Sequence, residues 1–196
     1  MKYEVILAGV GGQGVLSVGT IISSAAIEDG YNVRQSEVHG MAQRGGAVLA
    51  HFRISSKAIP SDLVPRGTAD LVLSMEPLEA IRYAQWLAPD RENGQGGALV
   101  TAAEPFDNIT NYPDINSVLD TIRSFPLYRI VEAAALAKEA GLPQSVNMVM
   151  VGAASSFLPI KVETLEKTIE KTFSLRYSST VEANIKAFHL GRNASR

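Results

Sequence analysis

The stretch V-I-L-A-G-V-G-G-Q-G-V, residues 5–15, decides the fold class of this chain. Its first six residues are an apolar run that ends among glycines, which predicts a buried strand. From Val15 onward apolar residues recur at helical spacing as far as residue 28, and Gly30 follows as a helix stop. A second strand is expected at residues 31–36. The chain therefore opens as a strand–helix–strand unit, for which the right-handed parallel arrangement is favoured.

Strand and helix signals alternate along the following part of the chain, and helices alone come after it. Residues 47–54 alternate in polarity, which indicates a half-buried strand that is antiparallel or at a sheet edge. Residues 104–117 are rich in Pro, Asn and Asp and predict a loop. The other expected elements are strands at residues 69–74 and 98–101, and helices at residues 77–87, 130–140, 145–157, 162–173 and from the capping box Ser179-x-x-Glu182 onward.

These patterns predict an α/β fold. We expect three layers, α/β/α, with a mostly parallel but mixed sheet in the N-terminal two thirds and a helical C-terminal third. At 196 residues, of which 46% are hydrophobic, the chain suits a single domain covering residues 1–196.

Composition excludes several classes of function. The 18 basic and 20 acidic side chains leave a net charge of −2 without a dense basic run, so nucleic acid is not an expected partner. No apolar stretch is long enough to span a bilayer and no signal peptide is recognisable, so we expect a cytoplasmic protein without membrane contact. There is no cysteine to hold an ordinary iron–sulfur cluster, and the three dispersed histidines form no zinc-binding pattern.

The glycine-rich turn after the first strand is one of two candidate functional segments. Gly9, Gly11 and Gly14 match the G-x-G-x-x-G pattern that opens a helix in phosphate-binding loops. A dinucleotide site usually adds an acidic side chain at the end of the second strand, whereas residues 32–36 read N-V-R-Q-S and the first acid is Glu37. Three interpretations stay open: a dinucleotide site, a tight turn without a ligand, and a loop that faces a partner chain or an anionic group.

The other candidate segment is S-E-V-H-G-M-A-Q-R-G-G at residues 36–46. It gathers a carboxylate, an imidazole, an amide and a guanidinium, and its glycines permit unusual backbone angles. Arg44 could clamp a carboxylate or a phosphate, and His39 could relay a proton near neutral pH. The alternative is a surface loop in which Glu37 pairs with Arg44, an exposed ion pair worth about 0–1 kcal/mol.

Together the two segments resemble the gamma-type domain of 2-oxoacid:ferredoxin oxidoreductases. The form S-E-V-H-G-M-x-Q-R-G-G is most similar to the beta subunits of the indolepyruvate type. The stretches A-D-L before E-P-L-E-A, and V-N-M before G-A, extend the resemblance from the N-terminus to about residue 155, whereas the C-terminal helices are generic. The resemblance implies a fold like domain III of pyruvate:ferredoxin oxidoreductase.

The same resemblance implies a small subunit that is inactive alone. In such enzymes a 2-oxoacid, here indolepyruvate, is oxidatively decarboxylated to an acyl-coenzyme A, and the electrons pass to ferredoxin. Thiamine diphosphate, Mg²⁺ and 4Fe–4S clusters are then expected in a large alpha subunit, with which this chain forms a heterodimer or heterotetramer. Coenzyme A is the co-substrate, and this chain alone is expected to bind none of the cofactors and no metal.

Site residues are carried over from the family onto both segments, and we expect both loops at the carboxyl edge of the sheet. The hypothesis is a wall around the partner's active site or its coenzyme A channel, in which Arg44 supplies positive charge and His39 a hydrogen bond. No residue is assigned as the catalytic base. The wall residues are Glu37, His39, Gly40, Gln43, Arg44, Gly45 and Gly46, and the glycine loop, which faces an anion or the partner, comprises Gly9, Gly11, Gly12, Gln13 and Gly14.

Two rival hypotheses remain. A stand-alone NAD(P)-dependent oxidoreductase rests on the glycine loop alone, and the missing acidic residue counts against it. A non-catalytic assembly or scaffold subunit predicts that the assembled complex turns over normally without this chain.

Overall fold

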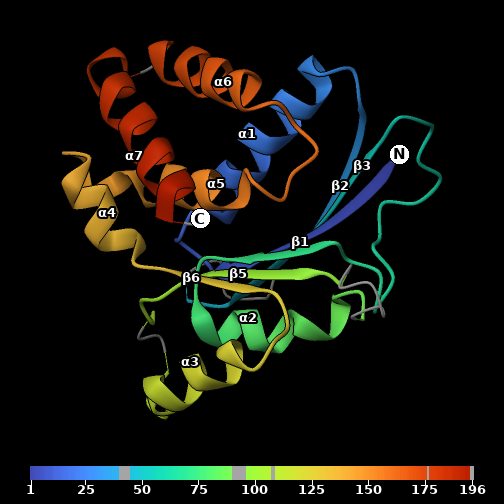
Figure 1. The fold of residues 1–196 in the computed structure, drawn as a ribbon, viewed down its shortest axis with the longest axis vertical. Coiled ribbons are helices and arrows are strands. Elements are labelled where there is room, and N and C mark those ends of the chain that lie inside the picture. Colours follow the sequence, from blue (N-terminus) through green and yellow to red (C-terminus); the bar gives the residue numbers. More distant parts are fainter. Residues whose placement is uncertain (40–44, 90–95, 107–108, 176, 195–196) are drawn as a thin grey trace.

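A six-stranded sheet lies between two layers of helices (Figure 1). The computed structural model describes residues 1–39, 45–89, 96–106, 109–175 and 177–194. The strands are β1 (Lys2–Val10), β2 (Asn32–His39), β3 (Ala47–Ser55), β4 (Leu71–Ser74), β5 (Ala98–Ala102) and β6 (Tyr128–Val131). The helices are α1 (Val15–Glu28), α2 (Pro77–Tyr83), α3 (Ile115–Arg123), α4 (Ala133–Glu139), α5 (Val146–Ala154), α6 (Val162–Ser174) and α7 (Val181–Ala194). The three-layer α/β/α prediction is confirmed.

The sheet is mixed, and a single reversed strand makes it so. Its strand order is β2-β3-β1-β4-β5-β6, with β1, β4, β5 and β6 parallel to one another. β3 is antiparallel to both β1 and β2. In the opening strand–helix–strand unit, β1 and β2 therefore run in the same direction, as predicted. They are not neighbours, because β3 lies between them in the sheet.

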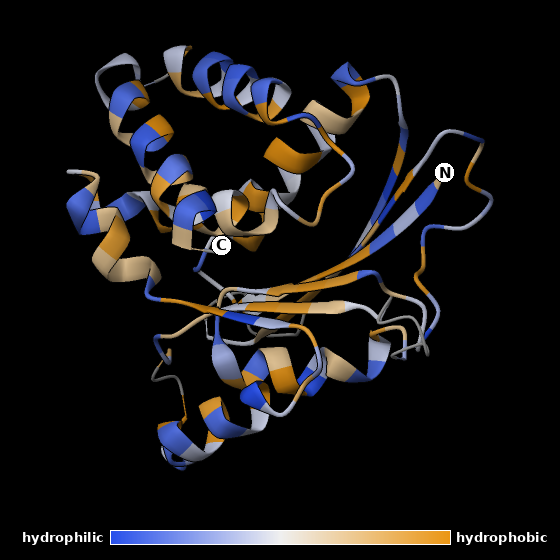
Figure 2. Ribbon diagram, in the orientation of Figure 1, coloured by the Kyte–Doolittle hydropathy of each residue, from blue (hydrophilic) through white to orange (hydrophobic). Residues whose placement is uncertain are grey.

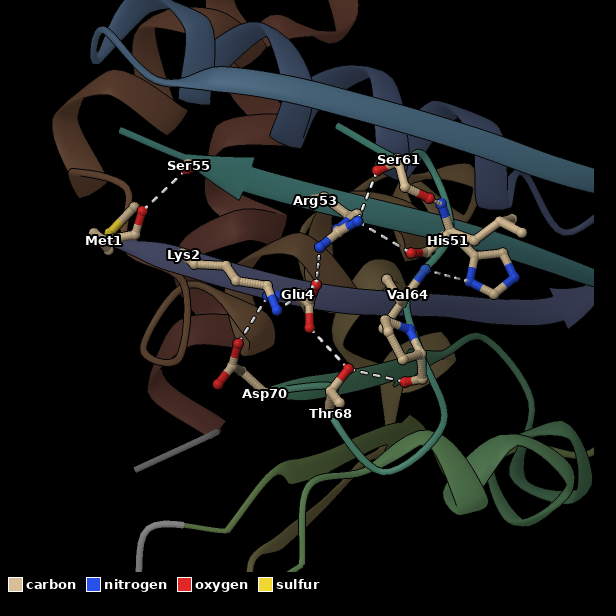
Figure 3. A network of polar contacts seen from close by, with 12 residues as sticks. Met1, Lys2, Glu4, His51, Arg53, Ser55, Ser61, Val64, Thr68 and Asp70 are labelled. Atoms are coloured by element: carbon tan, nitrogen blue, oxygen red, sulfur yellow. Dashed lines mark hydrogen bonds and ion pairs between the residues drawn. The ribbon is translucent and has the colours of Figure 1, made fainter. Parts of the chain in front are cut away.

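The sequence predicted that β3 would be half-buried and either antiparallel or at a sheet edge. It is antiparallel, but it is an inner strand of the sheet and is buried on both faces. Its side chains from residue 48 to residue 54 are all buried. The apolar face packs into the larger core, and the polar face is covered by the connection at residues 56–70. There, Arg53 donates to the carbonyl of Ser61 at 2.7 Å, and the backbone N–H of Val64 donates to Nδ1 of His51 at 3.3 Å (Figure 3).

The sequence-based prediction is wrong around residue 130, where it gives a helix. Residues 128–131 instead form β6, which pairs in parallel with β5 through Leu99 and Tyr128, and α4 begins only at Ala133. A four-residue strand is too short to show a period, and the alanines that follow it extend the helical signal backward. α3 also begins inside the expected loop at residues 104–117, because Asp114 caps it by accepting from the backbone N–H of Ser117 at 2.9 Å.

Each face of the sheet has its own core. The larger core lies between the sheet and helices α1 and α4–α7, and the smaller one lies under α2 and α3. Figure 2 shows hydrophobic residues running along the middle of the sheet, with hydrophilic residues distributed over the helical layers. Within the described ranges, none of the helices has the length and hydrophobicity needed to cross a membrane.

Candidate functional site at the carboxyl edge of the sheet

Both candidate segments lie at one edge of the sheet. The glycine loop follows β1, whose last residue Val10 pairs with Ala47, the first residue of β3. The second segment connects β2 to β3, and the end of β2 at His39 pairs with Val48. Because β3 runs against the other strands, its start lies beside their carboxyl ends. The two segments are thus brought together at the edge where sites of α/β proteins usually form.

The two segments touch through their backbones. The N–H of Gly11 donates to the carbonyl of Gly46 at 2.8 Å, and the N–H of Gly45 donates to the carbonyl of Gly11 at 3.1 Å. Gly45 has φ 76°, a left-handed conformation that side chains rarely adopt. These two bonds lie next to the end of the β1–β3 ladder at Val10 and Ala47, so the glycine loop and the end of the second segment are held together.

Gln13 closes the glycine loop from inside. Its Oε1 accepts from the backbone N–H of Val10 at 2.8 Å, and its Nε2 donates to the carbonyl of Met75 at 3.1 Å. The side-chain amide thereby ties the turn after β1 to the end of β4. A side chain at Gly9 has no room, because a methyl group there would lie 2.8 Å from Cγ2 of Val15. Gln13 and Gly9 therefore have structural roles in this turn.

The start of α1 is partly covered by α5. Gly14 caps the helix with φ 75°, and a methyl group at Gly14 would lie 2.3 Å from Nδ2 of Asn147. In dinucleotide-binding loops the second glycine is the point where the diphosphate approaches the backbone. Here that glycine is Gly11, and both its N–H and its carbonyl are bonded to the second segment. This geometry disfavours a dinucleotide site.

Only part of the second segment can be described. Glu37 is exposed on β2, and its Oε1 accepts a hydrogen bond from the side chain of Gln35. Residues 40–44, which include Gly40, Gln43 and Arg44, lie outside the described residues, as does the side chain of His39. The expected roles of these residues, and the alternative ion pair between Glu37 and Arg44, stay predictions.

A buried carboxylate that was not predicted as a site residue lies at the same edge. Glu76, 1% exposed, follows β4, and its Oε2 caps α2 by accepting from the N–H of Glu79 at 2.8 Å. Its Oε1 accepts from the hydroxyl of Tyr112 and from the N–H of Phe106, the latter at 3.5 Å. Burial, and then the bond to Glu76, raise the pKa of Tyr112, so its hydroxyl stays protonated as the donor. In the sequence Glu76 opens the E-P-L-E-A stretch and stands before Pro77 at an ordinary helix start, and neither feature indicates a buried carboxylate.

Known proteins are similar to this chain over most of its length. The family model described as pyruvate ferredoxin/flavodoxin oxidoreductase matches residues 4–194. The chain belongs to that family.

Relatives within this pyruvate ferredoxin/flavodoxin oxidoreductase family match over nearly the full length of the chain. Indolepyruvate oxidoreductase subunit IorB of Archaeoglobus fulgidus is 34% identical, over 98% of this chain and 95% of its own. The gamma subunit of a keto/oxoacid ferredoxin oxidoreductase from Geobacter sulfurreducens has 26% identity, a TM-score of 0.69 and 98% coverage of both chains.

A longer solved structure shares the fold of this family member. It is the 2-oxoglutarate:ferredoxin oxidoreductase from Magnetococcus marinus with 2-oxoglutarate, coenzyme A and succinyl-CoA bound, with 22% identity and a TM-score of 0.76. The match covers 99% of this chain but 31% of that one, so this chain spans about a third of the length of that protein.

The opposite edge of the sheet carries a polar cluster of a different kind. Glu4 on β1 is buried, and it pairs with Arg53 at 2.6 Å and accepts from the hydroxyl of Thr68 at 2.8 Å (Figure 3). The backbone N–H of Glu4 donates to Asp70 at 2.8 Å. These bonds fasten the connection before β4 to β1 and β3. This cluster lies at the amino ends of the parallel strands, away from both family motifs.

Proposed function

We propose that this chain is the small subunit of a thiamine-dependent indolepyruvate:ferredoxin oxidoreductase. The observation that carries the proposal is the near full-length similarity to the Archaeoglobus relative, whose name specifies indolepyruvate. The contact between the two family motifs at the carboxyl edge supports it, because a wall for another subunit's pocket needs both loops in one surface.

The proposal divides the work between two subunits. A chain without cysteine has no thiolates for iron–sulfur clusters, so the clusters that pass electrons to ferredoxin belong to a larger partner. In the described part of the chain, no group of three acidic or histidine side chains could hold a metal ion either. When bound in the partner, thiamine diphosphate with Mg²⁺ supplies the decarboxylation chemistry. Coenzyme A then accepts the acyl group.

This chain contributes positioning and charge. Arg44 supplies a guanidinium that pairs with a carboxylate or phosphate at the partner's site, and His39 supplies a hydrogen bond. Gly45 and Gly46 allow close approach of another chain, and their pairing with Gly11 holds the segment against the glycine loop. No residue of this chain is proposed as the catalytic base, and we expect the subunit to be inactive by itself.

The rival hypotheses lose support for different reasons. A stand-alone NAD(P)-dependent enzyme needs an open backbone at Gly11, which here is paired on both sides. A scaffold without a catalytic role does not require the carboxylate, imidazole and guanidinium that the sequence of the second segment contains. Titration of the isolated chain with NADH distinguishes the first rival, because micromolar binding would favour it.

Arg44→Ala in the reconstituted complex tests the proposal directly. We expect the variant to lose indolepyruvate oxidation or affinity for the large subunit by about tenfold or more, because a charge-assisted pair is removed. The matched control is Arg123→Ala on α3, whose guanidinium pairs with Asp120 on the protein surface. The assay is indolepyruvate-dependent dye reduction together with titration of the large subunit. Wild-type behaviour of Arg44→Ala in both measurements would end the assignment.

A further inference from the structure

The connection between β5 and α3 reaches the same edge of the sheet as the family motifs. Its described residues are 103–106 and 109–114. Glu104 fastens one end, because its Oε1 accepts from the backbone N–H of Ala134 in α4 at 2.7 Å. Phe106 and Ile109 project large apolar side chains that are 37% and 38% exposed. Because the connection is fastened to the rest of the fold, these partly exposed side chains are available to a partner without first having to be ordered.

Glu76 fastens the middle of this connection. One carboxylate oxygen accepts from both Tyr112 and the backbone of Phe106, while the other caps α2. The carboxylate is almost inaccessible, so its bonds to Tyr112 and to the N–H of Glu79 are strengthened by the low local dielectric, whereas the contact with the N–H of Phe106 is long, at 3.5 Å. The backbone of Glu76 is fixed as well, since its N–H and carbonyl both bond to the hydroxyl of Ser74.

The same residue stands next to the glycine loop. Met75, its chain neighbour, accepts from Nε2 of Gln13 at 3.1 Å and donates its own N–H to the carbonyl of Ala8 at 2.9 Å. A continuous series of bonds thus runs from Gly46 through the glycine loop to the turn after β4, and from Glu76 to the connection after β5. Four successive segments at the carboxyl edge are held in one arrangement.

We propose that Glu76 is a positioning residue that holds Phe106 and Ile109 beside the glycine loop as a second contact for the large subunit. The inference rests on the proposed function, which supplies the large subunit as the occupant. It adds a part of the interface that neither family motif contains. Glu76 acts through Tyr112 and the connection, and it touches no reacting group.

Exposed positions give the direct test, since their substitution leaves the core intact. Phe106→Ser in the full chain should weaken binding of the large subunit by about tenfold, because the variant lacks the aromatic side chain that becomes buried when the two subunits associate. The control is Leu63→Ser, which alters an apolar side chain of 55% exposure at the opposite edge and should leave the affinity unchanged.

Glu76 itself is tested by a double-mutant cycle. Tyr112→Phe and Glu76→Gln should each weaken binding of the large subunit several-fold. Because both substitutions break the same link between Glu76 and the connection, the double variant should bind no less tightly than the single variant with the lower affinity. Tyr31→Phe, directly before β2 at the opposite edge of the sheet, is the control that also removes a tyrosine hydroxyl. Thermal midpoints are recorded for each, because a residue with only a structural role lowers the midpoint and spares the affinity.

The outcomes separate this inference from the function on which it rests. If the wild-type chain binds the large subunit and supports indolepyruvate oxidation, while Phe106→Ser and Tyr112→Phe bind equally well, the positioning role is wrong and the proposed function stands. If the wild-type chain binds no cluster-bearing partner, both are wrong. Additive effects of Glu76→Gln and Tyr112→Phe would also overturn the linkage.

Discussion

His51 shows how a single side chain makes stability depend on pH. It lies buried on β3, and its Nδ1 accepts a hydrogen bond from the backbone N–H of Val64. Burial lowers its pKa below the ordinary value of 6.5, because the charged ring would lose its water. In the unfolded chain the ring gains a proton near pH 6.5, whereas in the folded chain it stays neutral to lower pH.

The free energy of unfolding should therefore fall as the pH drops below about 6.5, by about 1.4 kcal/mol for each unit by which the pKa is lowered. In His51→Asn the amide oxygen can take the acceptor position of Nδ1 and does not titrate. Urea unfolding measured between pH 5 and pH 8 should then give an unfolding free energy that changes less steeply with pH for the variant than for the wild-type protein. Equal slopes for both proteins would mean that His51 does not carry this dependence.

Only some features of the glycine loop could be predicted from its sequence. The turn itself and its place after a strand follow from the spacing of Gly9, Gly11 and Gly14. The bridge that the Gln13 amide makes between Val10 and Met75 cannot be predicted in this way, because Met75 is 62 positions away from Gln13 in the sequence. The contact between Glu76 and Tyr112, 36 positions apart, is hidden for the same reason. Local patterns fix backbone shape, whereas long-range pairing depends on the assembled sheet.

Helices α5 and α7 approach each other at a pair of glycines. A methyl group at Gly152 would lie 2.0 Å from the carbonyl oxygen of Phe188, and one at Gly191 would lie 1.9 Å from that of Val149. The two backbones are in direct contact, so α7 closes the larger core over α5. The generic appearance of the C-terminal helices in the sequence conceals this constraint.

Gly152→Ala should cost about 3 kcal/mol of unfolding free energy, because the helices must separate to admit the methyl group. Gly141→Ala is the control: its φ of 89° strains a side chain, but nothing lies within 4 Å, so about 1–2 kcal/mol is expected. Chemical denaturation of both variants measures the difference. A loss at position 152 no larger than at position 141 would contradict the close contact.

The elements with an apolar run or a helical period of their own were predicted well, and β6 was not. β1, α1, β4, β5 and α6 appear near their expected positions because each has a sustained apolar pattern. β6 has four residues and lies directly before an alanine-rich helix, so its signal is absorbed by its neighbour. The internal position of β3 could not be read from its alternation, because the residues that cover its polar side come from the following connection.

The whole subunit presents two edges of different character. The carboxyl edge joins loops from separate parts of the chain, whereas the amino edge is fastened by the buried pair of Glu4 and Arg53. If the carboxyl edge meets the large subunit, its backbone amides should become protected on assembly while those of the amino edge do not.

Hydrogen exchange measured with and without the large subunit checks this expectation. Amides at residues 9–14, 45–46 and 103–106 should exchange at least about tenfold more slowly in the complex, because local opening is suppressed by the bound partner. Amides at residues 56–70 serve as the internal control and should keep their rates. Protection confined to residues 56–70 would instead locate the interface at the other edge.

The reversed strand has a consequence for biosynthesis. β1 is bonded to β3 and β4, and both are translated after it. A nascent chain that has emerged only to Gly46 presents the apolar residues of β1 without either neighbour. At ordinary elongation rates this interval lasts on the order of several seconds, which is long enough for chaperones to engage an extended apolar segment. Slow codons placed between β1 and β4 should therefore lower the soluble yield more than the same codons placed after β4.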